Sequence, residues 1–168
     1  LVDHRQEHLY RLDAVSNHEV TFSIPVSSQL ANIITEYNQG KYNVSSLRTL
    51  VSSSALISQE LKEKLIDTFD CEIHEIYGAS EVGVVTNLAP PDSKKKLGTV
   101  GKALPVIDLK IVDDEGKTLP IGEKGEITCK TPSYFIGYYK RPDETAKAIV
   151  SGYFHTGDLG KLDKDGFL

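Results

Sequence analysis

The fold is decided by residues 72–81, which read EIHEIYGASE. Glu72–Ile76 is a short segment rich in isoleucine that ends just before a glycine, and this pattern predicts a buried strand followed by a turn. Ligands of an open parallel sheet bind at the carboxyl ends of its strands. We therefore expect a binding site in the loop Tyr77–Glu81.

Strands and helices alternate upstream of this stretch. The pattern predicts strands at Glu19–Ile24 and Arg48–Val51, a helix at Ser27–Asn38, and a second helix with Ser58 as its N-cap. Strands joined by single helices through short loops indicate right-handed βαβ units. The predicted fold class is α/β, with a mostly parallel sheet and flanking helices.

The character of the sequence changes at residues 89–93, which read APPDS. Two short strands follow, predicted at Asp108–Val112 and Glu126–Lys130. A helix is predicted after them at Asp143–Val150. We predict an α/β lobe over residues 1–91 and a smaller β-rich lobe, a distorted barrel, over residues 92–168.

Composition excludes several classes of protein. The 168 residues are 39% apolar and 26% charged, which is typical of globular chains, and no apolar run reaches the roughly 18 residues of a membrane-spanning helix. A net charge of −5 argues against a nucleic-acid surface. Cys71 and Cys129 form neither a disulfide framework nor a zinc motif, so we expect a cytoplasmic protein. The sequence has no methionine, and we expect it to be a piece of a longer protein.

The loop Tyr77–Glu81 has side chains that suit a nucleotide. Tyr77 offers a ring face to a base, Gly78 permits a close turn, and Ser80 offers a hydroxyl to a phosphate oxygen. Glu81 supplies a hard oxygen ligand for Mg²⁺. The alternative is a plain strand-to-loop turn in which the tyrosine fills the core.

A second candidate segment, residues 152–158, reads GYFHTGD and is interpreted as a short loop. The Asp158 carboxylate, flanked by glycine, can accept both hydrogens of a ribose cis-diol in charge-assisted hydrogen bonds. Alone, such an aspartate is more often a turn residue. Residues 135–145, FIGYYKRPDET, are interpreted as structural, as a strand, a loop and the start of a helix.

Taken in order, these segments resemble the adenylate-forming superfamily, which includes acyl-CoA synthetases and the adenylation domains of peptide synthetases. YGASE is similar to the YGxTE motif of that family, and GYFHTGDLG to its aromatic-x-TGD motif. GEITCKTPSYFIGYYKRPDET, GTVGKALP and SSLR resemble further family segments. The resemblance covers roughly residues 19–168. Within the superfamily, the sequence is most similar to the acyl-CoA synthetases (fatty-acid–CoA ligases).

The resemblance implies roles for single residues. Tyr77 would stack on adenine, Ser80 would contact the α-phosphate, Glu81 would bind Mg²⁺, and Asp158 would hold the ribose, with Ser80 and Glu81 as the catalytic pair. The implied nucleotide-binding residues are Ser54, Ala55, Tyr77, Gly78, Ala79, Ser80 and Asp158.

The implied reaction has two steps and uses ATP, Mg²⁺ and coenzyme A. A carboxylic acid attacks ATP to give an acyl-adenylate and pyrophosphate, and a thiol then displaces AMP. The alternatives are an amino-acid- or aryl-acid-activating adenylation domain and a non-catalytic nucleotide-binding relative.

The sequence departs from the family pattern in two places. Ser80 replaces the usual threonine but keeps its hydroxyl, and Ser52–Ala55 replaces a glycine-rich turn on the adenine side. The upstream phosphate loop and the downstream lysine of the family are not found in these 168 residues. We therefore expect the chain alone not to turn over ATP.

Overall fold

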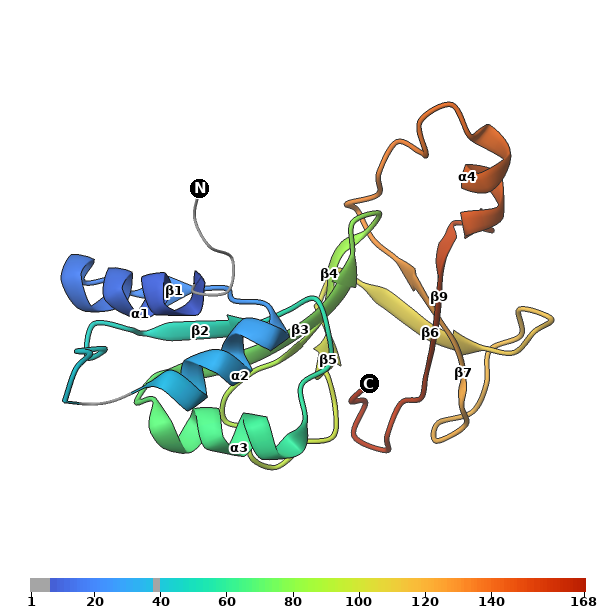
Figure 1. Cartoon of the computed structure of the whole chain (residues 1–168). Helices are drawn as coiled ribbons and strands as arrows, with labels where there is room; N and C mark the ends of the chain where they lie inside the picture. The colour runs from blue at the N-terminus through green and yellow to red at the C-terminus, as the bar shows by residue number, and fades with distance from the viewer. Residues whose placement is uncertain (1–6, 38–39) are drawn as a thin grey trace. The chain divides into compact units, whose positions relative to one another are not determined.

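The structure is a computed structural model that describes residues 7–37 and 40–168 (Figure 1). The chain divides into two compact units. The first unit takes in the chain as far as Ile76 together with Leu88–Gly98. The second consists of Tyr77–Asn87 and Thr99–Leu168.

The first unit contains the predicted βαβ units. Strand β1 (Phe22–Ser23) is joined by helix α2 (Ser27–Glu36) to β2 (Thr49–Ser52), and helix α3 (Gln59–Thr68) leads on to β3 (Glu72–Ala79). Both strand pairs, β1 with β2 and β2 with β3, are parallel. The α/β class and the parallel order of these strands are confirmed.

The ends of the elements follow local signals. The Ser58 side chain accepts a hydrogen bond of 3.1 Å from the Leu61 amide and so caps α3 as predicted. The strand predicted at Glu19–Ile24 is limited to β1, and Glu19 itself lies in the left-handed region with φ of 50°, outside the conformation of a strand. Helix α2 ends at Glu36, and Asn38, the last residue of that predicted helix, lies outside the described residues. Helix α1 (Glu7–His18) was not predicted.

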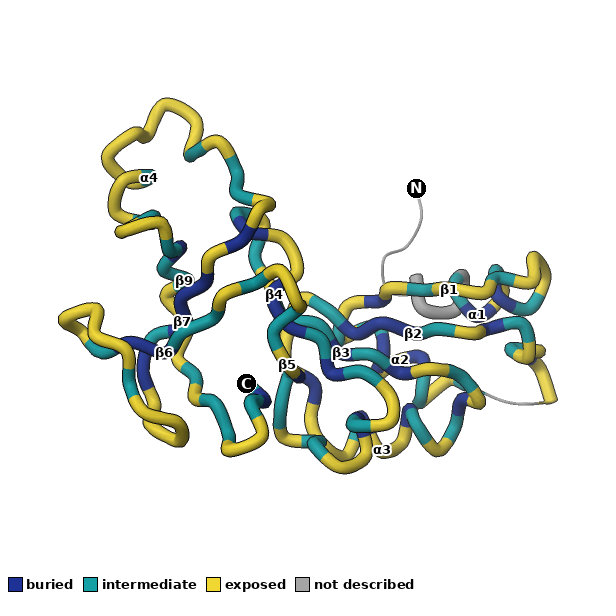
Figure 2. Tube along the Cα trace, turned by 180° about the vertical axis from the view of Figure 1, so that it is seen from behind, coloured by how far each residue is buried: buried dark blue, intermediate teal, exposed yellow. Residues whose placement is uncertain are grey.

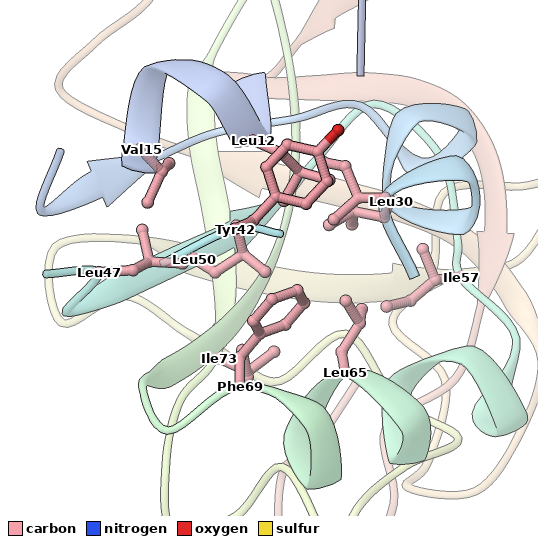
Figure 3. Close-up of a cluster of buried hydrophobic side chains, with 11 residues drawn as sticks. Leu12, Val15, Leu30, Tyr42, Leu47, Leu50, Ile57, Leu65, Phe69 and Ile73 are labelled. Atoms are coloured by element: carbon pink, nitrogen blue, oxygen red, sulfur yellow. The ribbon is translucent and has the colours of Figure 1, made fainter. Parts of the chain in front are cut away.

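One hydrophobic core holds the first unit together (Figure 3). Figure 3 shows side chains from the three helices and from β2 and β3 pointing toward one another. Leu30 and Leu65 are fully buried, and Leu50 of β2 lies in register with Ile73 of β3. The remaining buried members are Leu12, Val15, Ile33, Tyr42, Leu47, Ile57 and Phe69.

A buried ion pair crosses the same unit. Lys62 of α3 is 1% exposed and pairs with Glu75 of β3, which is 3% exposed. The Lys62 ammonium also donates to the Leu97 carbonyl at 2.7 Å, and the Ile57 amide donates to Glu75 Oε1 at 3.3 Å. These bonds tie α3, β3 and the segment 88–98 together.

The second unit is mostly antiparallel. Strands β4 (Gly83–Leu88) and β5 (Lys102–Ala103) are neighbours in the five-stranded sheet, whose order is β1-β2-β3-β4-β5. The second sheet is a curled antiparallel half-barrel of order β6-β7-β9-β8. Its strands are β6 (Asp108–Val112), β7 (Gly125–Lys130), β8 (Ile149–Val150) and β9 (Tyr153–Gly160). The predicted β-rich lobe is confirmed as a fold.

Two predicted loops are strand in the structure. Strand β3 continues through Ala79, so that the turn is formed by residues 80–82 and leads into β4, which was not predicted. A Cβ on Gly78 would lie 2.1 Å from the Gly83 carbonyl oxygen, so only glycine allows this close approach of the two strands. Strand β9 likewise includes Asp158.

The helix predicted at Asp143–Val150 is also shorter than expected. Helix α4 (Pro142–Ala148) ends directly before β8, because Ile149 and Val150 pair with Phe154 and Tyr153 of β9. Cross-strand pairing therefore prevails over the helical pattern at this point. Figure 2 shows that α4 and the loop before it are mostly exposed.

The two compact units differ from the predicted lobes at residues 77–87 and at residues 92–98. Val82 and Val85 pack with Cys129 and Phe154, so this segment belongs with the second unit although it precedes the turn-rich stretch. Figure 2 shows a buried stretch along β4. None of the described helices is long and apolar enough to cross a membrane.

Candidate functional site

The two motifs singled out from the sequence meet in the second unit. Tyr77, near the end of β3, donates a hydrogen bond of 2.8 Å from its hydroxyl to Asp158 Oδ2 on β9. Burial raises the pKa of the Tyr77 hydroxyl well above its usual value, and the hydrogen bond with Asp158 adds to the rise. Tyr77 therefore remains a donor at neutral pH and orients a carboxylate that is itself exposed.

A second carboxylate holds the irregular part of β9 that precedes Asp158. Glu126 of β7 contacts His155 Nδ1 through Oε2 at 2.7 Å and accepts a bond of 3.0 Å from the Gly157 amide through Oε1. Thr156 Oγ1 accepts from the Asp158 amide at 3.1 Å. The sequence-based assignment missed Glu126 as a positioning residue, because its partners lie about thirty residues farther along the chain and only the structure pairs them.

Glu81 lies at the turn after β3 and is half-buried. Its Oε1 accepts a hydrogen bond of 2.8 Å from the Tyr138 hydroxyl, and its backbone carbonyl accepts one of 2.7 Å from the Phe135 amide. Within the described residues, no second side chain hydrogen-bonds to this carboxylate. The neighbouring Ser80 is exposed.

The donor set at Glu81 fits a magnesium ion bound together with phosphate. Residues 7–37 and 40–168 contain no group of three or more His, Cys, Asp or Glu side chains that could hold a metal by themselves. Mg²⁺ is commonly bound by one or two carboxylates plus the phosphates of a nucleotide. A single half-exposed carboxylate is therefore sufficient for this kind of site.

Ser54 and Ala55 belong to the first unit and follow the carboxyl end of β2. Ser54 has φ of 75°, a conformation that favours glycine. The Ser27 hydroxyl donates to the Ala55 carbonyl, and it also lies 3.3 Å from the Ser53 carbonyl oxygen. The turn at Ser52–Ala55, in which serines replace the glycines of the pattern, thus keeps a glycine-like backbone at Ser54.

The first unit also has a polar cavity of about 400 Å³. Thr21 and Arg48, each immediately before a strand, are among the lining residues, so the cavity lies at the amino ends of β1 and β2. Ligands of such sheets bind at the opposite edge. The cavity is therefore a poor candidate for the nucleotide site.

Comparison with known proteins identifies the family. Residues 2–139 match the AMP-binding enzyme family. The chain belongs to this family. The resemblance stated from the motifs is thereby confirmed, and the chain is part of an AMP-forming ligase family.

Relatives of this AMP-binding chain include acid–thiol ligases. The chain is 33% identical over 161 residues to a fatty acid–[acyl-carrier-protein] ligase of Streptomyces coeruleorubidus, covering 94% of this chain and 31% of the relative. It is 36% identical over 154 residues to a 2-succinylbenzoate–CoA ligase of Geobacillus kaustophilus, covering 89% and 30%. The chain thus spans about 30% of the length of these relatives.

Solved structures show the same fold. The o-succinylbenzoate CoA synthetase of Bacillus subtilis, in complex with its acyl-adenylate intermediate, matches with a TM-score of 0.86 and 30% identity over 96% of this chain and 32% of that one. An amide bond synthetase of Marinactinospora thermotolerans matches with a TM-score of 0.88 and 28% identity over 96% of this chain and 33% of that one. The AMP-binding fold expected from the motifs is confirmed.

Proposed function

We propose that the protein that carries this chain is an ATP-dependent, AMP-forming acid–thiol ligase. It would activate a carboxylic acid as an acyl-adenylate and transfer the acyl group to coenzyme A. The observation that carries the proposal is the 2.8 Å hydrogen bond between Tyr77 and Asp158. It brings together the two motifs whose residue types suit a base and a ribose, although they lie 81 residues apart. Membership of the AMP-binding enzyme family supports the same assignment.

In this proposal the residues of the chain position the nucleotide. The ring of Tyr77 stacks on adenine, and Asp158, oriented by the Tyr77 hydroxyl, accepts the ribose hydroxyls in charge-assisted bonds. Gly78 and Ala79 bring the backbone close to the base, and the exposed Ser80 hydroxyl reaches the α-phosphate. Ser54 and Ala55 are assigned to the adenine side.

The first step is nucleotidyl transfer. A carboxylate oxygen of the acid forms a bond to the α-phosphorus of ATP, and the bond from that phosphorus to pyrophosphate breaks. Mg²⁺, held by Glu81 and the phosphates, would supply charge neutralisation. The protein contributes mainly position and electrostatic stabilisation.

In the second step a thiol sulfur forms a bond to the acyl carbon. The bond from that carbon to the AMP oxygen breaks, and the thiol proton passes to solvent. Coenzyme A is the proposed acceptor, because several relatives are CoA ligases.

The proposal is tested by ATP–pyrophosphate exchange in the complete protein that carries this chain, across a panel of fatty, aryl and amino acids. We expect exchange that depends on one class of acid and on Mg²⁺. AMP release is then compared with coenzyme A, a thiolated carrier protein and a simple amine as acceptors. Release with coenzyme A supports the proposal, and release only with one of the other acceptors replaces it by that activity. If no acid gives exchange while AMP still binds, the protein is a non-catalytic nucleotide-binding relative.

We also propose that the protein acts in the cytoplasm and that the 168 residues alone do not turn over ATP. The thiols of Cys71 and Cys129 are free, as is usual in reducing compartments. Imaging of the tagged complete protein tests the location.

A further inference from the structure

Residues 135–145, interpreted from the sequence as purely structural, contact the candidate metal ligand directly. We call this segment the brace. Two bonds join it to Glu81: the Tyr138 hydroxyl donates to Oε1 at 2.8 Å, and the Phe135 amide donates to the Glu81 carbonyl at 2.7 Å. One bond fixes the backbone of Glu81 and the other fixes its carboxylate.

Aromatic packing holds the Tyr138 ring in place. Its ring centroid lies 4.8 Å from that of Phe135 in an edge-on arrangement, and Phe135 in turn lies 6.2 Å from Phe154. Phe154 is 4% exposed and belongs to the core of the second unit. Tyr138 is 36% exposed, so it is held from one side only.

The start of α4 fixes the backbone of the brace. Thr145 Oγ1 accepts a hydrogen bond of 2.9 Å from the Tyr138 amide and donates one of 3.1 Å to the Arg141 carbonyl. Gly137 has φ of 146°, and a Cβ there would lie 3.1 Å from the Thr145 side chain. A hydroxyl at 145 and a glycine at 137 therefore set the position of Tyr138.

We propose that Tyr138 is a positioning residue for Glu81, and that the brace fixes the orientation in which this carboxylate receives Mg²⁺. The inference rests on the proposed function and deepens it. A carboxylate that uses one oxygen to accept from Tyr138 presents the other to the metal in a fixed direction. Partners of this kind commonly orient metal ligands in proteins, and their removal weakens metal binding.

The first test is a Mg²⁺ titration of ATP–pyrophosphate exchange in the complete protein that carries this chain. Tyr138→Phe removes only the hydroxyl and leaves the ring packing in place. We expect the Mg²⁺ concentration for half-maximal rate to rise about 3- to 10-fold, which corresponds to the loss of one partly exposed hydrogen bond. Tyr139→Phe is the matched control, because Tyr139 is 85% exposed, and it should change nothing. Equal behaviour of the two variants would overturn the proposal.

A double-mutant cycle separates a positioning role from a general loss of structure. In a Glu81→Gln background, Tyr138→Phe should have less than about twofold further effect, because the carboxylate that it orients is gone. Equal effects in both backgrounds would contradict the proposal. Thr145→Val should reproduce part of the Tyr138→Phe effect, whereas Thr145→Ser, which keeps the hydroxyl, should not.

Calorimetry distinguishes failure of the brace from failure of the proposed function. Tyr138→Phe should weaken binding of ATP in the presence of Mg²⁺ and leave binding of AMP without metal unchanged. If the unaltered protein shows no acid-dependent exchange but this selective loss is observed, the ligase proposal fails and the brace stands. If exchange is present and the two affinities fall together or not at all, the brace fails and the ligase proposal stands.

Discussion

At the scale of single residues, Ser54 is the clearest case of a side chain at odds with its backbone. Its φ of 75° lies in the left-handed region, where a residue with a Cβ is disfavoured by roughly 1–2 kcal/mol. Ser54→Gly should therefore stabilise the chain by about 0.5–1 kcal/mol, after allowance for the greater freedom of glycine in the unfolded state. Urea unfolding of the 168-residue chain measures this difference.

The neighbouring residue provides the control. Ser53 is not among the residues with positive φ, so Ser53→Gly should destabilise the chain by about 0.5–1 kcal/mol. A Ser54→Gly variant no more stable than the parent would show that the turn tolerates serine without strain. The sequence alone raised the question, since serines replace a glycine-rich turn there, but only the dihedral angle identifies which serine bears the strain.

Other site residues show where reading the sequence reaches its limit. Tyr77, Glu81 and Asp158 were singled out because their side chains suit a nucleotide and because the motifs occur in order. Tyr138 and Glu126 were not, although Tyr138 contacts Glu81 and Glu126 contacts Gly157, the residue before Asp158. Their importance comes from partners 57 and about 30 residues away, and a local pattern carries no information on such pairing.

At the scale of secondary structure, the buried pair of Lys62 and Glu75 makes α3 depend on β3. Lys62→Ala would leave the Glu75 carboxylate buried without its counter-ion, and the expected loss is about 3–5 kcal/mol of unfolding free energy. Lys64→Ala on the same helix is the control, because its partner Glu60 and Lys64 itself are both exposed, and such pairs contribute under about 1 kcal/mol. Urea unfolding compares the two variants.

A compensated variant tests the physical cause. Lys62→Met with Glu75→Gln removes both charges but keeps an acceptor for the Ile57 amide, so it should regain much of the lost stability. If the double variant were as unstable as Lys62→Ala, the lysine would act through packing rather than through charge. In the sequence, an apolar face of α3 is marked at helical spacing by Leu61, Leu65, Ile66 and Phe69. Lys62 is not part of that pattern, because the partner that allows its burial lies on a different element.

The elements themselves were largely predictable, and their ends were not. Periodicity and the Ser58 cap predicted α2, α3 and the strands of the βαβ units. The predicted end of β3 was wrong, and β9 was predicted as a loop, because both strands continue through motifs that contain glycine. At Gly78 the glycine serves close approach to Gly83 rather than a turn, and that distinction requires knowledge of the neighbouring strand.

At the scale of the whole molecule, the chain contains candidate contacts for the base, ribose, α-phosphate and metal, and it spans about 31% of the fatty acid–[acyl-carrier-protein] ligase that it resembles. We therefore expect the 168 residues alone to bind AMP weakly and to release no pyrophosphate from ATP with any acid of the panel. Calorimetry measures the first property and a coupled pyrophosphate assay measures the second.

Asp158→Asn should weaken AMP binding about 10-fold or more, because a neutral amide replaces the charge-assisted acceptor of the ribose hydroxyls. That loss would show that the parent chain is folded and binds through the proposed site. Acid-dependent pyrophosphate release by the chain alone would contradict the expectation, and AMP binding equal in the parent and the Asp158→Asn chain would remove Asp158 from the site.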